Sequence, residues 1–184
     1  MHILNLFLLV LPASILAAAV NRIVYVPEHS KAANNTSPNL ERNVGSVRWG
    51  DDDSTQDACD ADLTPVRSGG SEFLKADCEQ IIVFNNRYGR YTVSGFPFGE
   101  WGIINVKGTC AIAVARKDLS VNDFEVGDLD IRSSVQAAMD LYDSRVSMNS
   151  VTGSAVCDAA DTTGNDVPIK WWVVDPEDIP DGPL

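Results

Sequence analysis

The chain has 184 residues, 45% of them hydrophobic, a formal net charge of −12, four cysteines and two histidines. The acidic balance disfavours binding to nucleic acid or to anionic lipid, because both need a basic face. The histidines are His2 and His29, both close to the N-terminus, so the core has no histidine with which to build a Cys-His or Ser-His-Asp catalytic unit.

Residues 1–19 read as a cleaved signal peptide. They contain no Lys, Arg, Asp or Glu, and Ala17–Ala19 forms a small-residue cleavage signature. The apolar run is broken by Asn5 and Pro12 and is too short to span a membrane comfortably. The segment predicts a secreted, extracellular protein with no stable membrane anchor.

Residues 20–56 form a polar leader. Two overlapping sequons begin at Asn34 and Asn35, which are candidate glycosylation sites. Residues 51–62 contain six aspartates and no basic residue, but Asp51–Asp53 lacks the glycine and the glutamate of an EF-hand loop. We therefore expect a solvated acidic flank, with no metal and no cofactor.

The cysteines lie at positions 59, 78, 110 and 157. An even number in a small secreted protein predicts two disulfides, with three possible pairings. Zinc binding is disfavoured, because no C-x-x-C pair is present. At Cys78 a helix N-terminus could activate a thiol, but secretion and the lack of a core histidine favour a disulfide.

The main domain is expected over residues 57–158. Asp77 is placed to cap a helix that starts at Cys78 and stops near Gly89. Strand-like runs follow at residues 90–93, 101–106 and 109–115, with Lys107-Gly108 as the hairpin between the last two.

The clearest amphipathic helix is expected over residues 128–144. Its apolar positions recur with helical spacing, and its first turn is rich in aspartate. A closing strand that carries Cys157 follows at residues 152–158. Residues 159–184 form an acidic tail, in which Ile169–Val174 could add an edge strand.

This order predicts an α+β fold, a small disulfide-stapled sandwich in which two helices pack on one face of an antiparallel sheet. In that arrangement Cys78 on the first helix can reach Cys110 on a strand. Cys59 and Cys157 then join the first and last strands of the domain. We select this pairing, although the other two pairings stay open.

The domain resembles a family of secreted fungal effectors, the necrosis-inducing factors, which are homologues of the extracellular-protein-two effector of a plant pathogen. The resemblance rests on Asp77-Cys78 at a helix start, Trp101 before an apolar strand, GTCAIAV at Gly108–Val114, and an Asp-led helix before TGSAVC at Thr152–Cys157. It covers about 100 residues. It implies a small, disulfide-stapled effector that acts in the plant apoplast and promotes virulence or triggers host cell death. The family brings no known catalytic centre to transfer, so we expect no enzyme. The expected partner is a host protein or cell-surface target.

Two alternatives belong to other functional classes. A small secreted hydrolase would use paired carboxylates, with Glu100 beside Trp101 as the candidate, although an exposed turn residue is the plainer interpretation. A killer-toxin-like, membrane-active protein antagonising other microbes would need basic residues on one edge, such as Arg87, Arg90 and Lys107.

Two segments are candidate contact surfaces. The loop Tyr88–Gly102 is studded with aromatic residues and punctuated by glycine and proline. Either Trp171 or Trp172 is expected to be exposed, because neighbouring residues on a strand face opposite sides.

Overall fold

The computed structural model describes residues 45–54, 56–119, 122–160 and 165–180. The expected signal peptide and the sequons at Asn34 and Asn35 lie outside these residues. The described part is an α+β fold, built mostly from antiparallel strands with two helices and two disulfides.

The larger sheet has five strands in the order β2-β7-β8-β5-β4, and every neighbouring pair is antiparallel. Along its strands, apolar residues either alternate with polar ones or form continuous runs, so one face of the sheet can be buried. They are β2 (Cys59–Leu74), β4 (Gly102–Lys107), β5 (Cys110–Arg116), β7 (Ser147–Cys157) and β8 (Val167–Val174).

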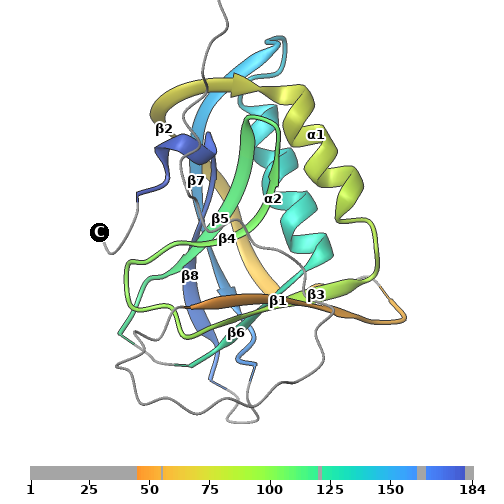
Figure 1. Ribbon diagram of the computed structural model, residues 1–184, viewed down its shortest axis with the longest axis vertical. Helices are drawn as coiled ribbons and strands as arrows, with labels where there is room; N and C mark the ends of the chain where they lie inside the picture. Colours follow the sequence, from red (N-terminus) through yellow and green to blue (C-terminus); the bar gives the residue numbers. More distant parts are fainter. Residues whose placement is uncertain (1–44, 55, 120–121, 161–164, 181–184) are drawn as a thin grey trace, which may run out of the picture.

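A second sheet of three strands was not expected from the sequence. It has the order β1-β3-β6, with β1 (Ser46–Asp51), β3 (Gly89–Ser94) and β6 (Phe124–Gly127). These strands cross the lower part of the molecule in Figure 1. Strand β1 lies in the predicted leader, yet its whole length pairs with β3.

The two helices, α1 (Lys75–Phe84) and α2 (Asp128–Asp140), contact each other and share one core with the strands. Alternate residues of β5 enter that core, as the strand period requires. The helical side chains that bury there come from Cys78 and Ile81 of α1, and from the predicted apolar face of α2: Ile131, Val135, Ala138 and Met139, with Tyr142 just beyond.

The opposite face of β5 carries Ala111 and Ala113, both fully buried. They pack in a separate small cluster with Ile179, and Trp101 and Trp172 lie against it. The ring centroids of these two tryptophans are 5.1 Å apart. Small β5 residues thus leave room for large indole rings on this side.

The tail strand β8 is not an edge strand. It lies between β7 and β5 and pairs with both along its length. The edge-strand prediction is wrong because Ile169, Trp171 and Val173 face the main core while Trp172 packs on the other side. A strand buried on both faces belongs in the middle of a sheet.

The start of α1 also differs from the prediction. The helix begins at Lys75 with Leu74 as its N-cap residue, and it ends at Phe84 rather than near Gly89. Strand β2 runs directly into it (Figure 1). The N–H groups at this junction find partners on neighbouring segments, since Leu74 donates to Thr109 Oγ1 and Lys75 donates to the Val146 carbonyl. These two bonds pair two of the N–H groups at the helix start, where no side-chain cap is formed.

The hairpin between β4 and β5 turns one residue later than predicted. Lys107 pairs with Cys110, so the two turn residues are Gly108 and Thr109. Gly108 has a φ of +51°, whereas Thr109 has no positive φ. A positive φ at the first central residue alone is the pattern of a type II′ turn, which prefers glycine there.

The central position of β8 gives a test of the domain boundary. A chain that ends at residue 158, the predicted limit of the domain, should fail to fold, because β5 and β7 would lose their shared neighbour and the core would lose Trp171. A chain that ends at residue 180 is the matched control and should unfold cooperatively. Far-UV circular dichroism and urea denaturation measure both. A cooperative transition in the shorter chain would contradict the assignment.

Candidate binding surface

The two disulfides join the pairs of cysteines selected from the sequence. Cys59 and Cys157 are directly opposite each other on β2 and β7, with their Cα atoms 3.9 Å apart. Cys78 in α1 is bonded to Cys110 at the start of β5, with a Cα–Cα distance of 5.3 Å. Cys78 and Cys110 are completely buried, so this bond is an internal staple and neither residue offers a thiol.

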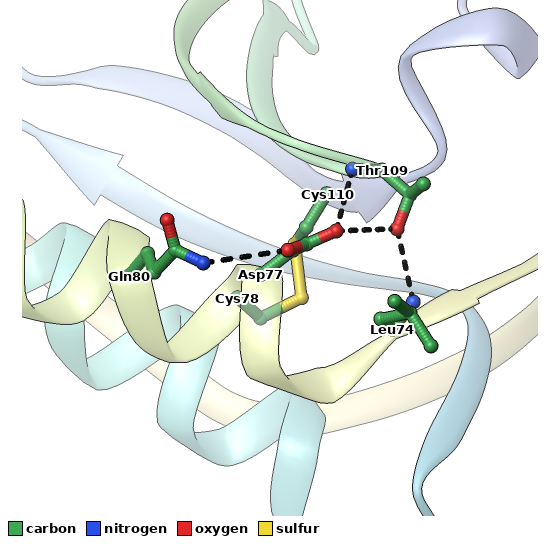
Figure 2. The surroundings of a disulfide bond; sticks show 6 residues. All are labelled: Leu74, Asp77, Cys78, Gln80, Thr109 and Cys110. Carbon is green, nitrogen blue, oxygen red and sulfur yellow. Dashed lines mark hydrogen bonds between the residues drawn. A yellow bond between two sulfur atoms is a disulfide. The ribbon is translucent and has the colours of Figure 1, made fainter.

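Hydrogen bonds around Asp77 strengthen this junction (Figure 2). The N–H and the hydroxyl of Thr109 each donate to Asp77 Oδ2 at 2.8 Å. A Cβ atom on Gly108 would lie 2.3 Å from the same carboxylate and would displace it from Thr109, and the positive φ also favours glycine here. Asp77, predicted as a cap, instead ties the first turn of α1 to the β4–β5 hairpin.

The C-terminal end of α1 is held by a second buried network. Asn85 is fully buried, and its Nδ2 donates to the Ile81 carbonyl at 2.8 Å. The hydroxyl of Tyr91 on β3 donates to Asn85 Oδ1 at 2.9 Å, and Arg87 Nη2 donates to that hydroxyl at 3.2 Å. Both ends of the helix are thereby fixed to different sheets.

Between these anchors, two cations stack on two aromatic rings. The Arg87 guanidinium carbon lies 4.2 Å from the Trp49 ring centroid and 4.0 Å from that of Phe84. Lys107 Nζ also lies 4.0 Å from the Phe84 centroid. We call Trp49, Arg87, Phe84 and Lys107 the cation–aromatic ladder. Its members come from β1, the loop after α1, α1 itself and β4.

Neither cation of the ladder forms an ion pair with a carboxylate among the residues that the structure describes. Arg90, grouped with them in the sequence analysis, differs: its Nη1 lies 2.6 Å from Glu125 Oε2 and its Nη2 3.9 Å from Asp52 Oδ2. The structure thus brings Arg87 and Lys107 together on one ring, whereas Arg90 is neutralised by acidic neighbours.

Two exposed apolar residues adjoin the ladder in sequence. Tyr88, which follows Arg87, is 51% exposed, and Val83, which precedes Phe84, is 75% exposed. Tyr88 is also the one non-glycine residue with a positive φ, +58°, in the described ranges. Cations held on aromatic faces and bordered by exposed apolar groups are suited to bind an anionic ligand that also has an apolar face.

The other predicted contact residues have different environments. The segment Tyr88–Gly102, predicted as a loop, contains strand β3 (Gly89–Ser94); in its remaining part Phe98 is 52% exposed, but Phe96 packs on the core against Gly45 and Gly102. Trp171 is buried and Trp172 is half-buried against Trp101, so neither is the exposed contact expected.

Sequence reasoning missed Trp49 and Phe84 as surface residues. Trp49 stands in the segment predicted as a polar leader, and Phe84 lies within the helix predicted to start at Cys78. No local motif could have found this pair, because the fold brings them together across 35 residues of sequence.

The aspartate-rich first turn of α2 holds a buried carboxyl group, that of Asp130, whose burial the sequence did not predict. Asp130 Oδ2 accepts from the N–H groups of Ala58 and Gly127, at 2.9 and 2.8 Å. Burial raises the pKa of Asp130 to about 7, a hydrogen bond with the Asp57 side chain and its charge add to the rise, and the two N–H donors oppose it. A neutral Asp130 therefore latches the segment before β2 onto α2.

The hydrolase alternative requires paired carboxylates, but the described part of the chain does not bring its candidate, Glu100, into a carboxylate pair. Glu100 lies in the turn before β4, where its N–H donates to the Pro97 carbonyl at 3.1 Å. Its side chain makes no hydrogen bond or ion pair to any described residue. A cavity of about 10 Å³ between α2 and the sheet, lined in part by Asp130 and Ser134, has room for a single water at most.

In the described ranges, no helix is long and apolar enough to cross a membrane, and no three or more His, Cys, Asp or Glu side chains gather as metal ligands would. No protein-family model matches the chain, and no curated protein matches it significantly.

The buried carboxyl gives a prediction for pH dependence. The folded state keeps the Asp130 proton up to about pH 7, whereas the unfolded chain loses it near the ordinary value of 3.8. The folded state thus binds more protons in this window, so the free energy of unfolding should fall as pH rises from about 4 to about 7 and should then level off. Asp130→Asn keeps an oxygen acceptor for both N–H groups and cannot ionise.

Urea denaturation at pH 5 and pH 8 measures this effect. The wild type should be less stable at pH 8 than at pH 5, and Asp130→Asn should lose most of that difference. Asp140→Asn, at the exposed C-terminal end of the same helix, is the matched control and should behave as the wild type. An equal pH dependence in Asp130→Asn and the wild type would contradict the assignment.

Proposed function

We propose that this protein is a secreted fungal effector that binds a host target in the plant apoplast and promotes virulence or triggers host cell death. The fungal and plant setting comes from the resemblance to the necrosis-inducing factors. Secretion comes from the expected signal peptide, and the two disulfides fit an oxidising, extracellular environment.

The observation that carries a binding role is the cation–aromatic ladder. Arg87 and Lys107 are held over rings and lack carboxylate partners, which leaves both charges available to a ligand. We infer that α1 and α2 form one layer on the five-stranded sheet, and that the Cys78–Cys110 bond holds this layer in place beneath the ladder. A surface fixed in this way loses little conformational entropy when a partner binds.

The ladder also distinguishes binding from membrane disruption. Its two cations stand in a stretch, residues 63–157, that carries nine basic and eleven acidic groups. Such a nearly neutral stretch gives poor general attraction to anionic lipid. Two fixed charges suit recognition of a particular anionic group instead.

Leaf infiltration tests the proposal. Purified, disulfide-bonded protein should cause necrosis in leaves of a susceptible plant, and deletion of its gene should reduce virulence of the source fungus. Protein that has been reduced and alkylated should lose the response, because the surface would no longer be held. The proposal fails if neither necrosis nor any loss of virulence is seen.

A further inference from the structure

We propose that the cation–aromatic ladder binds an acidic polysaccharide, a polymer whose uronic-acid residues carry a carboxylate on each sugar ring. The plant cell-wall setting rests on the proposed function. The ligand chemistry rests on the charges, rings and exposed surface of the ladder itself.

The spacing of the two charges suits neighbouring carboxylates. Arg87 and Lys107 both lie 4.0 Å from the centroid of Phe84, so their charged groups are at most about 8 Å apart. Arg87 is held from a second side by Trp49 and by the Tyr91 hydroxyl. One of its Nη atoms is used in that hydrogen bond, which leaves further N–H donors of the guanidinium for a ligand carboxylate.

The surrounding charges restrict where an anion can bind. Trp49 Nε1 donates to Asp51, so the Trp49 end of the ladder faces a carboxylate. No such carboxylate pairs with Arg87 or with Lys107 among the described residues. An anionic ligand is therefore drawn to the Phe84 end, where both cations lie, and is repelled from the Asp51 end.

The apolar border selects a sugar over a small inorganic anion. Tyr88 follows Arg87 in the chain and Val83 precedes Phe84, and both are more than half exposed. The C–H face of a pyranose ring can pack on such surface while its carboxylate reaches a cation. A phosphate or sulfate ion has no apolar face and would leave that surface in water.

Binding of de-esterified galacturonate oligosaccharides, measured by isothermal titration calorimetry, tests the inference. The wild type should bind them and should weaken as salt rises. The fully methyl-esterified oligosaccharides, which lack the charge, should bind at least roughly tenfold more weakly, as expected when charge-assisted hydrogen bonds are lost.

The matched variants are Arg87→Gln/Lys107→Gln and Arg48→Gln/Lys170→Gln, which remove two positive charges each. Arg48 and Lys170 are exposed on β1 and β8 and lie outside the ladder. The first variant should lose affinity by roughly tenfold or more, whereas the second should stay within about twofold of the wild type. Lys107→Gln alone, at a partly exposed site, should show a smaller loss and serves if the double variant does not fold.

Several outcomes would overturn the inference. These are no binding by the wild type, equal losses in the two double variants, equal binding of the esterified sugar, or equal binding of poly-glutamate, which would assign the site to acidic peptides. Leaf necrosis is scored separately with the same proteins. Necrosis without sugar binding would overturn this inference and leave the proposed function standing. Sugar binding without necrosis or virulence loss would overturn the proposed function and leave the sugar site standing.

Discussion

The bond between Cys78 and Cys110 fixes the point at which helix α1 meets the β4–β5 hairpin, and the candidate surface depends on that point. Lys107 is paired with Cys110 in the hairpin, and Phe84 ends the helix that begins three residues before Cys78. One buried covalent link therefore sets the distance between the ring and the cation that stacks on it. Closing a loop with a separation of 32 residues is worth about 3–4 kcal/mol in the chain-entropy model, a large share of the stability of a small domain.

Hydrogen bonds from polar groups orient the helix that the disulfide attaches. The Asp77 carboxylate receives both donors of Thr109, and Asn85 receives Tyr91, so each end of α1 is oriented as well as attached. At α2 a buried carboxyl group, that of Asp130, holds the start of the helix. Burial raises the pKa of Asp130, because its charged form is costly in this position. The neutral form can keep its hydrogen bonds without that cost, so the latch is strongest in acidic surroundings.

The sequence predicted the parts of the fold that depend on local pattern. The strand-like run at residues 109–115 and the helical spacing in residues 128–144 correctly indicated β5 and α2, because side-chain periodicity follows directly from backbone geometry. It did not predict the three-stranded sheet or the central place of β8. Those depend on which strands pair over long separations, which an apolar run such as Val167–Val174 does not specify. The ladder could not be predicted for the same reason. Only the folded chain brings Arg87 onto Trp49 and Phe84, and Lys107 onto Phe84.

The central claim is that the Cys78–Cys110 staple positions the cation–aromatic ladder, and ring-current shifts in the proton NMR spectrum test it most directly. In the wild type, the Lys107 side-chain protons next to Nζ should be shifted upfield by the Phe84 ring. With folding verified by circular dichroism, Cys78→Ser/Cys110→Ser should lose that shift, whereas Cys59→Ser/Cys157→Ser should keep it. An unchanged upfield shift of Lys107 in the first variant would contradict the account.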